Sequence, residues 1–223
     1  YAHCLPVQRR KAISIGEGMT PIVRDSENLY FKLDYINPTG SFKDRGAAVL
    51  VSRMKELGIR EALEDSSGNA GKAIATYCAR AGISCEILVP KNTAESKIKS
   101  MQNVGAEVKI IDGNRDDVAK TALDLAENKY YASHVWNPYF LQGTKTIAYE
   151  IFEQQKSIPQ RIIVPVGNGT LIIGLYLGLI EMKDSGLINS FPEIIGVQTE
   201  LCAPLADNYQ NKNTTQKFGN YSE

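Results

Sequence analysis

The chain has 223 residues, no net formal charge and 43% hydrophobic residues, which is enough apolar material to bury one large core or two smaller ones. The balanced charge, and the lack of a Lys/Arg cluster with interleaved aromatic residues, argue against a nucleic-acid binder. The longest apolar run, around 171–180, contains two glycines and is too short to span a bilayer. We therefore expect neither nucleic acid nor a membrane as a partner.

The cysteines and histidines do not form a recognisable metal site. None of the four cysteines belongs to a C-x-x-C pair, which argues against a zinc site or a redox motif. The two histidines, His3 and His134, lie far apart in the sequence, so histidine-based catalysis and a histidine-rich metal site are not expected. Unpaired cysteines and the lack of a recognisable signal peptide favour a cytoplasmic protein without a bound metal.

The first 60 residues are predicted to form a loop, a strand, a turn and a helix. The run 14–23 contains Gly-Glu-Gly and Thr-Pro, which indicates a loop followed by a short extended segment. Residues 29–34 alternate as a strand does, and the Asn-Pro-Thr-Gly turn at 37–40 ends that strand. The helix that follows carries apolar residues at helical spacing as far as Leu57, and Gly58 is its expected C′ residue.

Strands and helices alternate between about residue 60 and residue 134. Short strands are expected at 62–65, 87–89, 108–111 and 130–132. The first intervening helix closes at Gly82, the second has Thr93 as its expected N-cap, and the third begins at Asn114 or Asp116. This alternation predicts a parallel sheet with right-handed crossovers.

The remainder of the chain continues the same pattern. A helix follows Asn137-Pro138, and an apolar strand at 162–166 precedes a very apolar helix from 171 to about 183. The last clear strand is expected at 194–198. From Asp207 onward the chain is polar and is predicted to be a loop or a frayed end.

Lys43 stands in the first turn of the helix that follows the Asn-Pro-Thr-Gly turn. Backbone N–H groups without partners and the positive end of the helix dipole lie in such a turn. This setting disfavours an ammonium and lowers the pKa of the lysine, as an amine nucleophile requires. An ordinary surface lysine after a turn is the alternative, and composition alone favours that alternative.

Two further loops occupy the place where α/β proteins bind ligands, after a strand and before a helix. The small residues of 66–71 and 167–170 let backbone N–H groups approach an anion. A tight turn also needs Gly and Asn, so for the first loop alone the two interpretations are equal. A dinucleotide fingerprint requires G-x-G-x-x-G, and Gly174 is out of register with it, so that interpretation is weak for the second loop.

The motif Asn-Pro-x-Gly-Ser-x-Lys-Asp-Arg at 37–45, with Gly-Glu-Gly at 16–18, resembles the threonine synthase branch of the tryptophan-synthase-β-like enzymes. These are fold type II enzymes that use pyridoxal 5′-phosphate (PLP). The resemblance implies an α/β fold with two doubly wound parallel-sheet domains, of which the larger is incomplete. It places a small domain at 40–134 between the parts 1–39 and 135–223 of the large domain.

The resemblance also assigns residues to the cofactor and the substrate. It implies that Lys43 binds PLP covalently and that Asn69 hydrogen-bonds the phenolic oxygen of PLP. The implied residues for the substrate carboxylate are Ser66, Ser67, Gly68, Asn69 and Ala70, and those for the PLP phosphate are Gly167, Asn168, Gly169 and Thr170. One departure is Lys72, which opens a helix where a small residue is expected.

The activity implied is elimination or replacement at the β- or γ-carbon of an amino acid, closest to the conversion of O-phosphohomoserine to threonine. Typical threonine synthases have Arg at the position of Phe140, and that Arg binds the substrate phosphate. Ser66, Asn137 and Lys145 lie in matching segments and are expected to compensate in part. The enzyme alternatives are a serine/threonine ammonia-lyase and a cysteine synthase-like enzyme.

A different class of alternative is an inactive fragment or a non-catalytic binding protein. Family members continue beyond the position of Glu223, and the part beyond it normally supplies the hydroxyl that faces the pyridine nitrogen. We therefore expect the 223-residue chain alone to be poorly active. The expected partner is a small-molecule amino-acid substrate, and a homodimer remains open.

Overall fold

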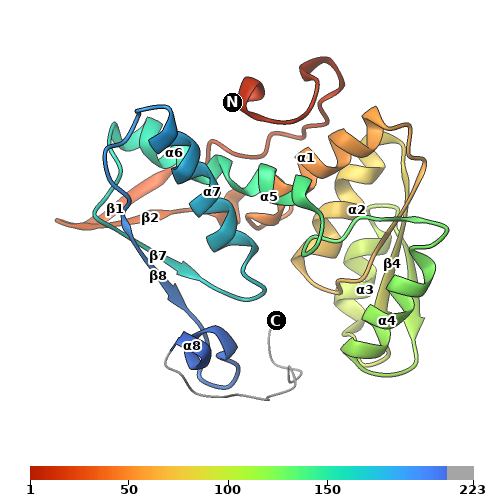
Figure 1. Ribbon diagram of the computed structural model, residues 1–223. Coiled ribbons are helices and arrows are strands. Elements are labelled where there is room, and N and C mark those ends of the chain that lie inside the picture. Colours follow the sequence, from red (N-terminus) through yellow and green to blue (C-terminus); the bar gives the residue numbers. More distant parts are fainter. Residues whose placement is uncertain (210–223) are drawn as a thin grey trace.

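The computed structural model describes residues 1–209 and shows two groups of elements joined by two helices (Figure 1). The first group is built on the strands β3 (Glu61–Glu64), β4 (Ser84–Pro90), β5 (Glu107–Ile111) and β6 (Tyr130–Tyr131). The second is built on the strands β1 (Ile22–Ser26), β2 (Leu29–Lys32), β7 (Arg161–Pro165) and β8 (Glu193–Val197). The helices α1 (Lys43–Glu56) and α5 (Pro138–Thr144) pack against each other between the groups.

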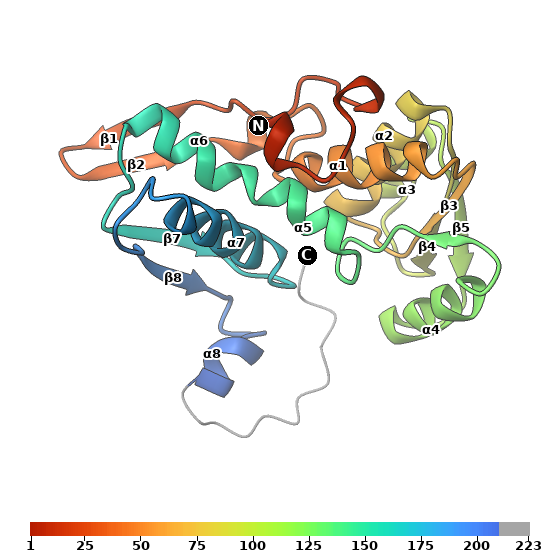
Figure 2. The same ribbon diagram turned by 45° about the horizontal axis from the view of Figure 1, so that its top comes forward.

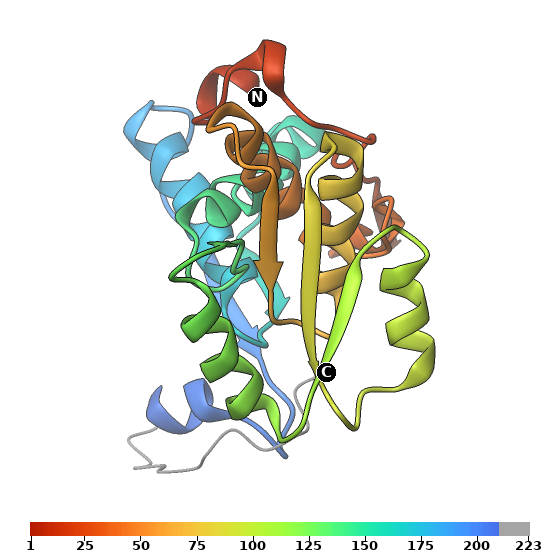
Figure 3. The same cartoon turned by 90° about the vertical axis from the view of Figure 1, so that its right-hand side faces the viewer.

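The first group contains a parallel sheet with the strand order β5-β4-β3-β6. Its crossover helices are α2 (Asn69–Ala81), α3 (Glu95–Gln102) and α4 (Arg115–Leu125). In the register of the sheet, Ala62 of β3 lies opposite Cys85 of β4 and Tyr130 of β6. Figure 3 shows α3 and α4 on opposite sides of the strands. The predicted parallel sheet at 60–134 is therefore confirmed.

Both faces of the central strands β3 and β4 are buried, which explains the apolar run Ile87-Leu88-Val89 in β4. Ala62 and Ile87 point into a core shared with α1, α2 and Met101 of α3. Leu63 and Leu88, one position along each strand, point into the opposite core with α4. The side-chain period of two thus divides each strand between two layers of helices.

The second group is a thinner assembly. β7 pairs in parallel with β8, and β1 forms an antiparallel hairpin with β2. Figure 2 shows α7 (Thr170–Asp184) across β7 and β8, with α6 (Thr146–Gln155) alongside. Val164 of β7 joins these helices in a buried core, whereas Ile163 and Val197, on the other face, are 62% and 51% exposed. Within residues 1–209, that second face carries no covering layer.

The ends of the helices agree with most of the local signals. Gly82 ends α2 with φ of +69°, a left-handed conformation that glycine adopts without strain. Asn114 caps α4, and it forms a capping box with Asp117 as N3. No helix within residues 1–209 is long and apolar enough to cross a membrane.

Three local expectations are wrong. Thr93 does not cap α3, because its N–H donates to the carbonyl of Pro90 in a turn and the helix begins at Glu95. The strand expected at 29–34 stops at Lys32, and a 3₁₀ turn follows. The helix α8 (Pro204–Tyr209) includes the start of the polar segment expected to be a loop from Asp207; the rest of that segment lies outside the described residues.

The contact between α1 and α5 generates a prediction about stability. A Cβ atom at Gly143 would lie 1.9 Å from the backbone oxygen of Arg45 and 2.7 Å from Cα of Gly46. We expect Gly143→Ala to lower the free energy of unfolding by about 3 kcal/mol or more, because backbone cannot move aside as a side chain can. Urea denaturation of the intact protein measures this. Gly167→Ala is the matched control, since nothing lies within 4 Å of its added Cβ.

Candidate active site

Three elements converge on the side chain of Lys43. The residue begins α1, and its Nζ donates a hydrogen bond to Oγ1 of Thr170 at the start of α7, 3.3 Å away. The same Nζ lies 4.9 Å from the ring centre of Phe42 and 5.8 Å from that of Phe140 on α5. The predicted reactive lysine and one predicted residue of the 167–170 loop are thus in direct contact.

The environment of Lys43 lowers its pKa to about 8. Burial of the amine is the largest cause, and the carboxyl of Glu64 opposes the shift. The expected direction is confirmed, but desolvation rather than the helix terminus dominates. An amine with this pKa is unprotonated in roughly one molecule in ten at neutral pH, far more often than an exposed lysine.

The turn before Lys43 is held by buried hydrogen bonds. Both the N–H and the hydroxyl of Thr39 donate to the carboxylate of Asp44, over 3.2 Å and 2.8 Å. Oδ1 of Asn37 accepts a hydrogen bond from the N–H of Gly18 at 2.9 Å, which ties the turn to the Gly-Glu-Gly segment. The two sequence segments that carry the resemblance are therefore adjacent in space.

Arg45 fixes the first turn of α1 through buried ion pairs. Its guanidinium donates to Asp34 at 2.7 Å and to Glu150 of α6 at 2.5 Å, and all but 2% of the residue is buried. The carboxylate of Glu150 also pairs with the ammonium of Lys32 at 2.8 Å and accepts a hydrogen bond from the N–H of Met19 at 2.8 Å. These charge-assisted bonds connect α1 to β2, to α6 and to the 16–21 segment.

The loop at 66–70 leads directly into α2. Asn69 begins the helix with an exposed side chain, and the hydroxyl oxygen of Ser66 accepts the N–H of Gly68 at 3.3 Å. A Cβ atom at Gly71 would lie 1.9 Å from the carbonyl oxygen of Ser66, so this turn requires glycine there. The ammonium of Lys72 donates to the carbonyl of Thr39 at 3.1 Å and thereby links this loop to the turn before Lys43.

The loop at 167–170 connects β7 to α7. Gly169 precedes the helix with φ of +89°, which favours glycine. Oδ1 of Asn168 accepts the N–H of Thr170 at 3.2 Å and its hydroxyl at 2.9 Å. Nothing lies within 4 Å of the position that a Cβ atom of Gly167 would take, so the backbone there is open to a ligand.

Phe140 packs tightly against Gly46 of α1. Its side chain is completely buried, and its ring lies 2.4 Å from where a Cβ atom of Gly46 would be. Phe140 is therefore a wall of the site that fills space against α1. Gly46 is the residue that makes room for it.

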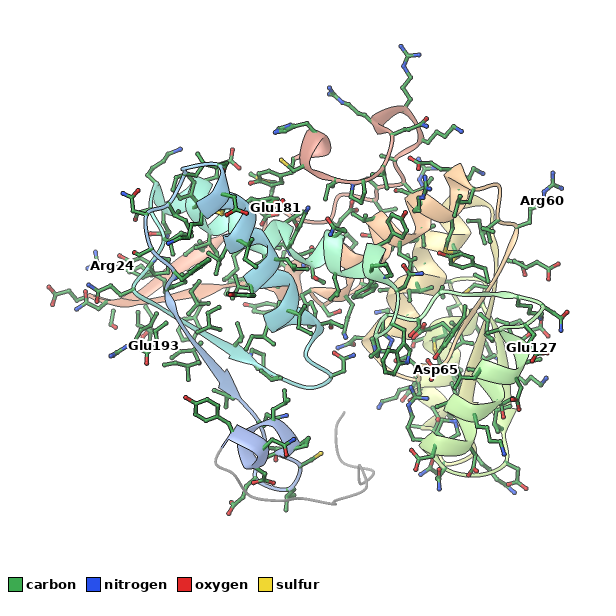
Figure 4. The ribbon with its side chains drawn as sticks, in the orientation of Figure 1. Arg24, Arg60, Asp65, Glu127, Glu181 and Glu193 are labelled. Atoms are coloured by element: carbon green, nitrogen blue, oxygen red, sulfur yellow. The ribbon has the colours of Figure 1, made fainter. Side chains whose placement is uncertain are left out.

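Asn137 and Lys145, which with Ser66 are expected to compensate in part for Phe140, are bonded to other protein groups in this structure. The ammonium of Lys145 is buried and paired with Glu181 at 2.6 Å, toward the C-terminal end of α7 (Figure 4). Oδ1 of Asn137 caps α5, and its amide donates to the hydroxyl of Tyr130. Both side chains already have partners within their own helices or neighbouring elements.

Sequence reasoning dismissed His134, yet it lies in the same region as Lys43. Nδ1 of His134 lies 2.6 Å from Oε1 of Glu64, and the ring of His134 lies 6.0 Å from that of Phe140. The available signal was the acidic pair Glu64-Asp65 directly after Ala62 and Leu63 of a buried strand. An acidic side chain in a buried strand requires a partner, and His134 is that partner.

The sequence comparisons agree with this geometry. The family model for pyridoxal-phosphate dependent enzymes matches residues 13–220. The threonine synthase of Methanocaldococcus jannaschii is 37% identical over 95% of this chain and 55% of its own length. That of Methanosarcina acetivorans is 39% identical over 92% of this chain and 53% of its own length. The chain thus spans about half the length of these curated relatives.

Among solved structures, the chain is similar to a fungal L-serine ammonia-lyase from Rhizomucor miehei. The TM-score is 0.77 at 25% sequence identity, over 90% of this chain and 66% of that one. This likeness confirms the expected α/β fold.

A prediction follows from the burial of Phe140. We expect Phe140→Arg to lower the free energy of unfolding by about 3 kcal/mol or more, because it would bury a guanidinium against Gly46 and close to the amine of Lys43. Phe140→Leu should cost less, since it leaves a smaller side chain and no charge. Thermal denaturation of the intact protein compares the two. Equal stability of Phe140→Arg and the parent protein would mean that this side chain reaches solvent.

Proposed function

This chain belongs to the family of pyridoxal-phosphate-dependent enzymes, and from that premise we propose that it acts in elimination or replacement at the β- or γ-carbon of an amino acid. The observation that carries the proposal is the amine of Lys43. It is buried, its pKa is lowered to about 8, and it meets Thr170 at 3.3 Å where α1 and α7 begin. An amine nucleophile and base needs this partly unprotonated state.

The residues around Lys43 suit the cofactor of this family, pyridoxal 5′-phosphate. When bound, PLP supplies an electron sink for the α-carbon of the substrate. Lys43 would hold it covalently, and Asn69 would hydrogen-bond its phenolic oxygen. The phosphate would lie on Gly167, Asn168, Gly169 and Thr170. The N-terminus of α7, whose N-cap Gly169 makes no side-chain cap hydrogen bond, and the open space beside Gly167 support this assignment.

The start of α2 is the proposed site of the substrate carboxylate. Backbone N–H groups and hydroxyls at a helix N-terminus favour an anion, and the proposed residues are Ser66, Ser67, Gly68, Asn69 and Ala70. The bond from Lys72 to Thr39 holds this loop beside the lysine turn. Once the amino group of the substrate had replaced Nζ of Lys43 on the cofactor, the freed amine would take the proton from the α-carbon.

We propose the same division of the chain as the resemblance implies, with a small domain at 40–134 between the parts 1–39 and 135–223 of a large domain. Two separate buried clusters support it, one that lies mostly within 40–134 and also takes in Phe140, and one that lies within 147–188. We also propose a cytoplasmic enzyme that forms a homodimer. The exposed apolar side chains of Ile163 and Val197 support association.

The proposed reaction is closest to that of threonine synthase, which the similarity to the two archaeal enzymes supports. A serine/threonine ammonia-lyase is the second candidate. Phe140 offers no charge to a substrate phosphate, and the ammonium of Lys145 is already paired with Glu181. These two observations favour an unphosphorylated hydroxyl amino acid over O-phosphohomoserine.

The first test of the proposal maps the cofactor. Borohydride reduction of the intact protein with PLP, followed by peptide mass mapping, should place the pyridoxyl group on Lys43. Lys43→Arg should abolish the label, because a guanidinium does not form the linkage. A label on Lys72 or Lys145 would contradict the proposal.

The second test compares substrates on the intact protein. We expect the preference in kcat/KM for O-phosphohomoserine over serine or threonine to be smaller than in typical threonine synthases by about tenfold or more, or reversed, since a missing charge-assisted bond costs roughly 1.5–3 kcal/mol. Lys145→Met is the matched control and should leave this ratio unchanged. A strong preference for O-phosphohomoserine, lost in Lys145→Met, would mean that Lys145 turns from Glu181 to hold the phosphate.

A further inference from the structure

The proposed function gives no role to a buried acidic pair beside Lys43. Glu64, the last residue of β3, is 0% exposed, and Asp65 is 2% exposed. Figure 4 shows Asp65 among the elements of the first group. Arg115 of α4 compensates Asp65 over 2.6 Å. Glu64 has a different environment: Oε1 meets His134, and Oε2 has no hydrogen-bond partner within the described part of the chain.

Two buried rings, those of His134 and Phe140, lie between Glu64 and the amine of Lys43. Glu64 contacts His134 at 2.6 Å, the His134 ring lies edge-on to Phe140 at 6.0 Å, and Phe140 lies 5.8 Å from Nζ of Lys43. Because His134 and Phe140 are buried, little water screens the interaction between the carboxyl and the amine. Glu64 is the group whose charge acts on the pKa of Lys43.

Burial favours the neutral forms of both Glu64 and His134. Burial raises the pKa of Glu64 well above its ordinary value, and burial lowers that of His134 to about 3. An imidazolium is therefore disfavoured, and the exchangeable proton of the pair belongs to Glu64. The titratable and charged groups that face Glu64 are His134, Asp65, Arg115, Lys43, Tyr131 and Cys85.

We propose that Glu64, held by His134, is a positioning residue that opposes the effect of burial on Lys43 and so adjusts how often its amine carries a proton. As a carboxylate, Glu64 accepts the Nδ1–H of His134 and favours the ammonium of Lys43. As a carboxylic acid, Glu64 donates to Nδ1 of His134, and the ammonium loses its counter-charge. The proposal rests on the role of Lys43 in the proposed function, and it adds a group that adjusts the proton state of that lysine.

A metal ion is the competing explanation, because ligand atoms of Glu64, Asp65 and His134 lie within 4.8 Å of one another. The distance of 2.6 Å between Nδ1 and Oε1 is that of a hydrogen bond. Two ligands of one zinc ion lie roughly 3 Å or more apart. Arg115 already balances the charge of Asp65. The geometry thus favours a shared proton.

The test measures the pKa of Lys43 directly. The intact protein is used in its cofactor-free form, because PLP would block the amine. Lys43 is labelled by reductive methylation across about pH 5 to 10, and peptide mass spectrometry gives the rate at each pH. The midpoint should lie near 8 in the parent protein. Circular dichroism checks the fold of each variant.

Four variants distinguish an electrostatic effect of Glu64 on Lys43 from a purely structural role of the Glu64–His134 pair. Glu64→Gln should lower the midpoint by about one pH unit, because the ammonium loses its counter-charge. His134→Leu should lower it similarly, because an unpartnered Glu64 stays neutral. His134→Gln, which still donates to Glu64, and Asp65→Asn, the matched acid-to-amide control, should leave the midpoint within a few tenths of a unit. If Glu64→Gln does not fold, the two His134 variants decide alone.

Three results would overturn the proposal. The first is an unchanged midpoint in both Glu64→Gln and His134→Leu, and the second is an equal shift in Asp65→Asn. The third is a midpoint of the parent protein that moves on addition of Zn²⁺ or Mg²⁺, which would make the cluster a metal site. None of these depends on the borohydride experiment, so failure of this inference is distinguishable from failure of the proposed function.

Discussion

The position of the candidate site depends on the buried guanidinium of Arg45. It bonds to Asp34, which follows β2, and to Glu150 on α6, so segments more than 100 residues apart meet at the first turn of α1. Removal of any one partner would leave an uncompensated buried charge, which typically costs about 3–5 kcal/mol. Arg45 lies two residues after Lys43, and the same bonds that satisfy its charge therefore fix where the lysine amine lies.

Around this anchor, close backbone approach brings the remaining parts together. Gly46 and Gly143 let α1 and α5 meet without side chains between them, and Phe140 fills the space above Gly46. Thr170 then approaches Lys43 from the start of α7. The low dielectric of this environment, more than any single contact, holds the amine partly unprotonated. The packing that buries the amine of Lys43 is therefore also what lowers its pKa.

Local signals predicted the fold well, because they depend on neighbouring residues. Gly82 and Asn114 end or begin helices through contacts within a few positions, and the strands of the parallel sheet follow from their apolar runs. The local errors lie at the ends of elements, where Thr93 does not cap α3 and the strand at 29–34 stops at Lys32. The pairings that were missed join distant positions: Glu64 lies 70 residues from His134, and Glu181 lies 36 residues from Lys145. Contacts between residues this far apart in the chain are not visible in a single sequence.

Thr39 has a mechanical role that follows from its hydrogen bonds. Its carbonyl is held by Lys72 of α2, whereas its N–H and hydroxyl are held by Asp44 of α1. One residue is therefore clamped from both sides, by two helices that each begin at a candidate ligand loop. The start of α2 and the first turn of α1 therefore share one hydrogen-bonded residue, so the two candidate ligand loops are joined through Thr39 as well as through the chain.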